Sequence, residues 1–466
     1  MPSDPPSPSE TEPSLQALPG LAASIFAEVL QRDEAEPMRP YRDADSLRSD
    51  LPLSIDGEPL PWPQTLQLLR DVLAATPSTT SRRFFNQLFG GRDPVASLAE
   101  LSTVLLNSPM HTFKASGVQV LIEREVLRRM AQRAGMPDGD GAITPGGSLS
   151  NLMGMLMARN EALSGARERG LPAAPARIYT SAASHYSVRK AAGILGLGRD
   201  SVRRVPIDHG GRMRPDALAE MIEQDRAAAA VPVMINATSA TTVLGAFDPL
   251  DAIADVAERA GVWLHVDAAY GGSVLLSERH RHLLRGCERA DSLTWDAHKL
   301  LGVPLTCSAL LTRRPGLCAR HLDEPAGYLF QEDALFDPGR GSLQCARRND
   351  ALKLWLTWKH RGDVGLGARI DRLFELAAHA AARIEAEPRL RLVRPPASIN
   401  VCFEVLGVPA RTLCRELWER GIAKIGHASV DDREIVRWVF VNPQVEPADI
   451  DEVLDELLTL AEHLRR

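Results

Sequence analysis

The segment VWLHVDAAYGG, residues 262–272, is an apolar run that ends abruptly in a carboxylate and continues into small residues. This pattern is typical of a buried β-strand whose last side chain, Asp267, lies at the carboxyl edge of a sheet. Similar short runs at 177–180, 231–237, 292–295 and 308–312 alternate with amphipathic segments of helical length. The alternation predicts an α/β domain with a mostly parallel sheet and helices on both faces. Ligands of such sheets bind beyond the carboxyl ends of the strands, so a site is expected near Asp267.

The rest of the chain divides into parts of different character. Residues 1–14 are rich in Pro, Ser and Glu and are predicted to be disordered. Residues 15–100 alternate helical patterns with proline-broken connections, which indicates an N-terminal helical arm. Residues 101–350 form the predicted large domain, and 351–466 a small α+β C-terminal domain. That domain is expected to end in a helix from Pro447 with one apolar stripe.

Composition narrows the function class. The chain has 466 residues, 44% of them hydrophobic and 24% charged, with a formal net charge of −6. It therefore lacks the basic field that binds nucleic acid or an anionic membrane surface, and we expect neither partner. The N-terminus has no signal-peptide pattern and no apolar run approaches the roughly 18–20 residues of a membrane helix, so a cytoplasmic location is expected. Six cysteines without a CxxC pair indicate neither a disulfide framework nor a metal site.

One lysine lies at the predicted carboxyl edge of the sheet, where ligands of this fold bind. Lys299 follows the strand pattern at 292–295 in the sequence TWDAHK, and it is one of only six lysines. A primary amine at the carboxyl edge of a sheet can form a Schiff base with a carbonyl cofactor when its pKa is lowered. Most loop lysines are merely solvated, so the interpretation depends on neighbouring residues.

Three further elements supply possible partners. Asp267 could hold a pyridinium nitrogen protonated, although a helix N-cap is an equally good explanation. Gly147 and Ser148 open a helix whose free N–H groups could bind a phosphate, although simple capping explains them too. His185, at a strand-to-helix junction, could stack on a cofactor ring and act as an acid or base, although most lone histidines are structural. Together with Lys299 they predict a site for pyridoxal 5′-phosphate (PLP).

These residues lie in motifs that identify a family. The chain resembles the PLP-dependent group II decarboxylases of the aspartate-aminotransferase fold, fold type I, and most closely the glutamate and cysteine-sulfinate decarboxylases. The resemblance runs from about Arg82 to the C-terminus. Its clearest stretches are RFFNQLFGG (83–91), ITPGGSLSN (143–151), SHYSVRKAAGILGLG (184–198), HVDAAYGGSVLLS (265–277), DAHKLLGVPLTCSALL (296–311) and LQCARRNDALKLWL (343–356).

The resemblance implies a role for each matching residue. Lys299 would carry PLP as a Schiff base and Asp267 would pair with its pyridine nitrogen, both with His185 as catalytic residues. The remaining cofactor contacts would be His185 and Ala269 on the two ring faces, Thr242 at the polar edge, and Gly147, Ser148 and His298 around the phosphate. Gln87, His111 and Arg437 would contact the substrate. The family also implies a homodimer with the site at the subunit interface.

The chain departs from the family pattern at three places. Asp296 replaces the usual asparagine before the His-Lys pair, which puts a carboxylate near the expected phosphate and requires a compensating donor. The segment around His111 lacks the asparagine and phenylalanine of glutamate decarboxylases, so the pocket for the distal acid group is rebuilt. Phe336 matches the position of the family's catalytic loop tyrosine. By elimination, His185 becomes the candidate that returns a proton to Cα, with a pKa suited to neutral pH.

The resemblance implies α-decarboxylation of an amino acid, giving an amine and CO₂. Glutamate, aspartate, cysteine sulfinate and 2,4-diaminobutyrate are all candidate substrates. Phe336 adds a second possibility, decarboxylation-dependent oxidative deamination to an aldehyde. A non-enzymatic scaffold with the same fold is a third alternative, which the intact set of cofactor residues disfavours.

Overall fold

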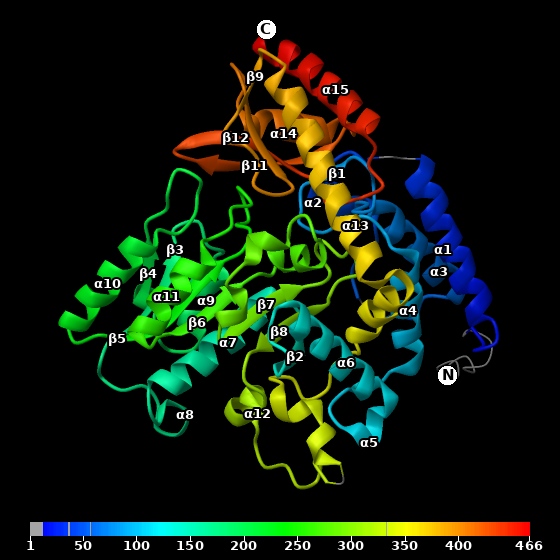
Figure 1. The fold of residues 1–466 in the computed structure, drawn as a ribbon. Coiled ribbons are helices and arrows are strands. Elements are labelled where there is room, and N and C mark those ends of the chain that lie inside the picture. Colours follow the sequence, from blue (N-terminus) through cyan, green and yellow to red (C-terminus); the bar gives the residue numbers. More distant parts are fainter. Residues whose placement is uncertain (1–12, 36–37, 56, 332) are drawn as a thin grey trace.

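The computed structural model describes residues 13–35, 38–55, 57–331 and 333–466 (Figure 1). The predicted disordered segment, 1–14, lies outside this range except for its last two residues. The large sheet occupies the middle of the molecule, the small sheet lies above it, and the first helices extend along one side.

A seven-stranded sheet forms the centre of the large domain. Its order is β2-β8-β7-β6-β5-β3-β4, and only β8 runs antiparallel to its neighbours. The strands are β2 (Asp140–Thr144), β3 (Ala176–Ser181), β4 (Val202–Val205), β5 (Val231–Thr238), β6 (Trp263–Asp267), β7 (Ser292–Asp296) and β8 (Ser308–Thr312). The predicted mostly parallel α/β fold is therefore confirmed.

Sequence periodicity missed the strands β2 and β4. In β2 the sequence DGAIT contains a glycine, because a Cβ atom on Gly141 would lie 2.1 Å from the carbonyl oxygen of Leu310 on β8. In β4 the sequence VRRV places charged side chains at the edge of the sheet. Neither segment has the continuous apolar run that identifies a central parallel strand.

Helices cover both faces of this sheet, as predicted. One face packs against α7 (Gly147–Ala162), α9 (Ser187–Ile194) and α12 (Leu317–Leu322). The other packs against α6 (Val118–Arg133), α10 (Pro215–Ala227), α11 (Leu250–Ala260) and part of α13 (Ala351–Glu385). The kink at Gly362 (φ +63°) divides α13, whose C-terminal part reaches the small domain (Figure 1).

A five-stranded sheet, ordered β1-β11-β12-β10-β9, forms the small domain. Its strands are β1 (Phe84–Phe85), β9 (Leu390–Leu392), β10 (Asn400–Val405), β11 (Lys424–Val430) and β12 (Arg433–Val439). Two helices complete it, α14 (Ala410–Glu419) and α15 (Pro447–Arg465). The apolar stripe of α15 is buried, as expected for the terminal helix.

The N-terminal region consists of α1 (Leu18–Ala35), α2 (Ala44–Asp50), α3 (Trp62–Ala75) and α4 (Pro94–Leu106). The purely helical prediction is wrong at Phe84–Phe85, which pairs with β11 in the small sheet. Phe85 is buried there, edge-on to Trp438 at 5.4 Å between ring centroids. A two-residue strand is too short to show a period in the sequence. Two further α-helices, α5 (Phe113–Ser116) and α8 (Ala166–Arg169), are only four residues long.

No helix among the described residues combines the length and the apolar character required to span a bilayer.

Candidate active site

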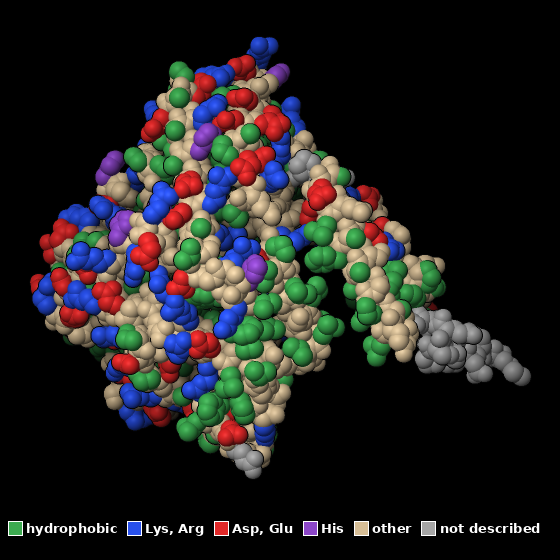
Figure 2. Space-filling view, turned by 45° about the vertical axis from the view of Figure 1, so that its right-hand side comes forward, with side chains coloured by type: hydrophobic (Ala, Val, Ile, Leu, Met, Phe, Trp, Pro, Cys, Tyr) green, Lys and Arg blue, Asp and Glu red, His purple; other side chains and the backbone are tan. Residues whose placement is uncertain are grey.

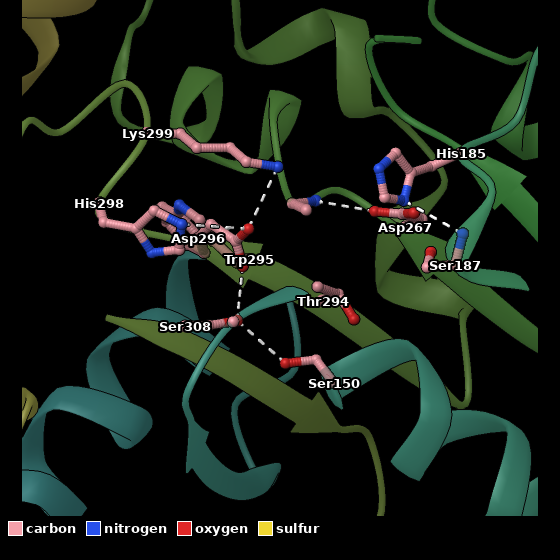
Figure 3. Close-up of polar contacts among 12 residues, drawn as sticks. Ser150, His185, Ser187, Asp267, Thr294, Trp295, Asp296, His298, Lys299 and Ser308 are labelled. Atoms are coloured by element: carbon pink, nitrogen blue, oxygen red, sulfur yellow. Dashed lines mark hydrogen bonds and ion pairs between the residues drawn. The ribbon is translucent and has the colours of Figure 1, made fainter. Parts of the chain in front are cut away.

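Four of the predicted residues, His185, Asp267, His298 and Lys299, gather at the carboxyl edge of the large sheet (Figure 3). Asp267 ends β6 and Asp296 ends β7. Because β8 runs antiparallel, it begins at this same edge, and Ser308 pairs directly with Asp296. Parallel strands bring their carboxyl ends together, so residues far apart in sequence share one site.

Lys299 lies one turn beyond Asp296. Its Nζ is 3.1 Å from Asp296 Oδ2, and its side chain is 23% exposed. The Lys299 side chain extends across the site toward Asp267 and His185 (Figure 3). The amine is thus half-enclosed and has a carboxylate beside it.

Asp267 is held by two donors. The backbone N–H of Ala269 donates to Oδ1 at 3.2 Å, and Asn151 Nδ2 donates to Oδ2 at 2.7 Å. Asn151 Nδ2 also donates to Ser187 Oγ at 3.0 Å, while its Oδ1 lies 2.8 Å from Thr294 Oγ1. A buried amide with both its donor and acceptor sides used fixes the orientation of its partner.

Asn151 also contacts a fully buried histidine, His265. His265 Nε2 is 3.0 Å from Asn151 Oδ1, and burial lowers the pKa of His265 to about 4. His265 is therefore neutral at physiological pH, and its Nε2–H can donate to Asn151. The motif ITPGGSLSN ends at Asn151, but the sequence alone assigns this residue no role. Its place four residues after Gly147, on the same helix face, was the available signal.

His185 lies over the same edge, near Asp267. The backbone N–H of Ser187 donates to His185 Nδ1 at 3.3 Å, so the imidazole hydrogen is on Nε2. Burial lowers the pKa of His185, and Lys299 lowers it further, while Asp267 and Asp296 act in the opposite direction. The sequence suggests a pKa suited to neutral pH; in the structure the pKa of His185 lies below its ordinary value, because desolvation disfavours the imidazolium.

Asp296 receives the compensating donors that its sequence position requires. Ser308 Oγ donates to Oδ1, and Lys299 contacts Oδ2. Because the Ser308 hydrogen is used in this way, Ser308 must accept from Ser150, 3.0 Å away. Ser150 in turn accepts from Thr144 at 2.6 Å. A chain of hydroxyl groups thus supports the carboxylate.

The start of α7 lies against this carboxylate. A Cβ atom on Gly147 would be 2.8 Å from Asp296 Oδ2 and 3.0 Å from Ala269 Cβ, so only glycine leaves the backbone open here. The next residue, Ser148, is exposed. The first N–H groups of a helix have no intrahelical acceptor and suit an anion.

His298 lies on the other side of Asp296. Its Nε2 is 3.6 Å from Asp296 Oδ2, and its Nδ1 contacts the backbone of Cys307. Burial is the main cause that lowers the pKa of His298. The structure thus brings Gly147, Ala269, Asp296, His298 and Lys299 together.

A second group of predicted residues lies where the small domain meets the large one. Arg437, on β12, donates from Nε to the carbonyl of Thr242 and from Nη1 to the carbonyl of Asn86, both at 2.9 Å. The adjacent Gln87 has a buried Oε1 without a hydrogen-bond partner among the described residues. Burial lowers the pKa of Arg437 from its ordinary value. Gln87, Thr242 and Arg437 are therefore neighbours.

The Thr242 segment is also held by a residue that sequence reasoning missed. Asn400 Nδ2, on β10, donates to the carbonyls of Thr242 and Val243, both at 2.9 Å. Tyr270 donates to Asn400 Oδ1 at 2.8 Å. No sequence signal links position 400 to position 242, because the contact exists only between the two domains.

Among the described residues, no hydrogen bond or ring contact joins His111 to this group. Its carbonyl accepts from the Gly339 N–H at 3.0 Å, and its ring lies 3.2 Å from Thr112 Oγ1. Phe336, on the same segment as Gly339, packs on Phe113 with ring centroids 5.6 Å apart. Within one chain, His111 and Phe336 therefore belong to a separate cluster.

Comparison with known proteins places the site in a family. A model of the pyridoxal-dependent decarboxylase conserved domain matches residues 45–406. The chain belongs to this family. It is accordingly a PLP-dependent amino-acid decarboxylase of fold type I.

Individual relatives match over nearly their whole length. The chain is 42% identical to the cysteine sulfinic acid decarboxylase of Mus musculus, over 92% of each chain. It is 37% identical to the acidic amino acid decarboxylase GADL1 of Homo sapiens, over 93% of this chain and 88% of that protein. The crystal structure of mouse CSAD superposes with a TM-score of 0.91 at 39% identity, covering 96% of this chain and 99% of that one.

The residues present fit PLP. The start of α7 at Gly147 packs closely on Asp296 and Ala269, so its first backbone N–H groups lie at this edge of the sheet, where they could bind an anion. Asp267 offers a fixed carboxylate, and Lys299 offers an amine at the same sheet edge. This donor set matches the phosphate, the ring nitrogen and the carbonyl carbon of the cofactor.

Proposed function

We propose that this enzyme removes the α-carboxyl group of an acidic amino acid, releasing an amine and CO₂. The candidate substrates are cysteine sulfinate, glutamate and aspartate. The relatives named for cysteine sulfinic acid and for acidic amino acids support this class. The observation that carries the proposal is Arg437, a partly buried guanidinium that donates to two carbonyl oxygens and has further N–H groups that could bind a carboxylate or sulfinate.

The residues around Lys299 would hold the cofactor. Lys299 would bind it covalently through Nζ, and Asp267, fixed by Asn151, would keep the pyridine nitrogen protonated. When bound, PLP supplies an electron sink for the pair of electrons left by the departing CO₂. The other proposed cofactor contacts are Gly147, Ser148 and His298 for the phosphate, His185 and Ala269 for the ring faces, and Thr242 for the polar edge.

The substrate would lie between the two groups of site residues. Arg437 and Gln87 would orient its acidic groups, because a guanidinium fork pairs bidentately with a carboxylate or sulfinate. His111 would reach this pocket only from a second subunit, since its own chain holds it near Gly339. His185 is the proposed proton donor to Cα: as an imidazolium it would donate from Nε2 and return to the neutral ring, and because burial lowers its pKa this step is favoured at lower pH.

A homodimer with the site at the interface is part of the proposal. Hydrophobic side chains gather on the face formed by α4 and the start of α6 and along the N-terminal helices (Figure 2). On α4 and α6 they include Leu98, Leu101, Val104, Leu105, Leu106, Val118 and Leu121, all of which are exposed in one chain. Soluble monomers rarely expose apolar patches of this extent, so a second copy of the chain is the proposed cover.

A reducing, cytoplasmic setting completes the proposal. The cysteines from Cys287 to Cys414 are free thiols, and all but Cys345 are buried. Proteins that keep their thiols unpaired are typical of reducing compartments.

Product analysis tests the proposal. The purified enzyme, loaded with PLP, is incubated aerobically with cysteine sulfinate, glutamate, aspartate and 2,4-diaminobutyrate while CO₂, amine, aldehyde and hydrogen peroxide are measured. We expect CO₂ and amine in equal amounts from an acidic substrate. CO₂ from 2,4-diaminobutyrate alone would refute the substrate class. Peroxide equal to CO₂ would instead establish aldehyde formation, the alternative that Phe336 favours in place of a loop tyrosine.

A further inference from the structure

The carboxylate of Asp296 is in direct contact with the beginning of α7. A Cβ atom on Gly147 would lie 2.8 Å from Asp296 Oδ2 and 3.1 Å from Oδ1. The Asp296 side chain is only 2% exposed. Water therefore screens its charge poorly, and the charge acts strongly on any ion held at this helix start.

The proposed function places the phosphate of PLP at this same helix start, and the inference rests on that placement. Two anions would then share one buried subsite. Of the described residues that face the carboxylate, Lys299 is the nearest cation, at 3.1 Å. His298 stands 3.6 Å away, Ser308 contributes a neutral hydroxyl, and His185 and Asp267 lie beyond Lys299.

Lys299 cannot always neutralise the charge of Asp296, because it is also the amine that would hold the cofactor. When the amine is free, its ammonium offsets the carboxylate. With the cofactor bound through the amine, its phosphate would add negative charge at the start of α7, beside Asp296. The hydroxyl chain from Thr144 through Ser150 to Ser308 stabilises the ionised carboxylate in both states.

We propose that Asp296 sets the affinity of the enzyme for the phosphate group of its cofactor. Its carboxylate weakens the binding of a doubly charged anion at the start of α7, and the Lys299 ammonium offsets part of this effect. The enzyme therefore holds PLP more loosely than a neutral side chain at position 296 would allow. The fraction of loaded enzyme then follows the supply of PLP.

Anion binding to the cofactor-free enzyme tests the proposal without any turnover. Sulfate serves as the probe because it carries two charges throughout the neutral pH range, and calorimetry gives its dissociation constant. Asp296→Asn should tighten sulfate and PLP binding by about tenfold or more, because it removes a unit negative charge from beside a doubly charged anion in a poorly screened site, less the part that Lys299 offsets.

A matched control removes the same charge from the other end of the same strand. Asp291 immediately precedes β7 and accepts the Leu264 N–H at 3.0 Å. It lies five residues before Asp296, roughly 16 Å along the strand. Asp291→Asn should change sulfate affinity less than about twofold, because the charge is distant.

The role of Lys299 is tested by a double-mutant cycle. Lys299→Ala should weaken sulfate binding more when Asp296 is present than in the Asp296→Asn background, because the ammonium then has a carboxylate to offset. Equal or weaker sulfate and PLP binding by Asp296→Asn would overturn the proposal. If circular dichroism shows that this variant does not fold, Asp296→Ser removes the same charge and is judged by the same criterion.

One further variant separates this inference from the proposed function. Gly147→Ala should weaken sulfate binding in every background, because its Cβ atom would lie 2.8 Å from Asp296 Oδ2 and 3.0 Å from Ala269 Cβ and would displace the helix start. Sulfate binding that Gly147→Ala leaves unchanged would show that the phosphate placement in the proposed function is wrong. Weaker binding in Gly147→Ala with no effect of Asp296→Asn would refute only the role of Asp296.

Discussion

Replacing Arg437 by alanine should cripple the enzyme through loss of an anion contact. The partly buried guanidinium donates from Nε and Nη1 to the carbonyls of Thr242 and Asn86, and Nη2 and the second Nη1 hydrogen would serve the substrate. Removing one partner of a buried, hydrogen-bonded charge pair costs about 2–5 kcal/mol. We therefore expect kcat/KM to fall by roughly 30-fold to several thousandfold.

The assay compares substrate with product. Steady-state decarboxylation gives kcat/KM, and inhibition by the product amine gives the affinity for a ligand that has lost its α-carboxylate. If Arg437 binds the α-carboxylate, Arg437→Ala should leave amine inhibition within a few-fold of normal; if it binds the distal acidic group, which the product keeps, amine inhibition should weaken together with kcat/KM. Arg437→Lys should recover only part of the activity, because an ammonium cannot reproduce the planar fork.

A control variant measures how much of the loss in kcat/KM comes from loosening the Thr242 segment. Asn400 also donates to the Thr242 carbonyl and carries no charge, so Asn400→Ala loosens the same segment and leaves the cation in place. Its loss of kcat/KM should be much smaller than that of Arg437→Ala. Equal losses in the two variants, accompanied by equal weakening of amine inhibition, would refute the anion contact and leave Arg437 as a support for the segment.

Three further predictions concern the residues around the cofactor. Lys299→Ala should abolish turnover while the fold is retained by circular dichroism, and borohydride reduction of the unmodified enzyme should fix the cofactor to Lys299; attachment at another lysine would contradict the assignment. Asp267→Ala should lower kcat by about 10² or more through loss of a preorganised charge, and near-normal turnover would exclude that role. Because burial lowers the pKa of His185, its protonated fraction grows as the pH falls, and the rate of amine formation should rise with it. His185→Gln should remove this pH dependence and raise the yields of aldehyde and peroxide, and an unchanged pH profile would count against His185 as the acid.

The parallel sheet could be predicted from sequence because its central strands are buried on both faces. Burial requires short, continuous apolar runs, and the runs leading to Asp267 and Asp296 are of this kind. The position of Lys299 relative to the sheet edge followed in the same way, since local sequence sets where a strand ends. The charged edge strand β4 and the glycine-containing β2 escaped prediction because they lack such runs.

By itself, the sequence determined the α/β class, the strands that end at the site, and the family motifs around Gly147, Asp267 and Lys299. Only the tertiary structure decided which side chains meet. Asn151 orients Asp267 across 116 residues, and Arg437 contacts the backbone beside Gln87 across 351 residues. It also decided that His111 lies beside Gly339 in its own chain, and that burial lowers the pKa of His185. The physical reason is that hydrogen bonding and desolvation depend on distance in space, whereas sequence patterns record only the local periodicity of burial.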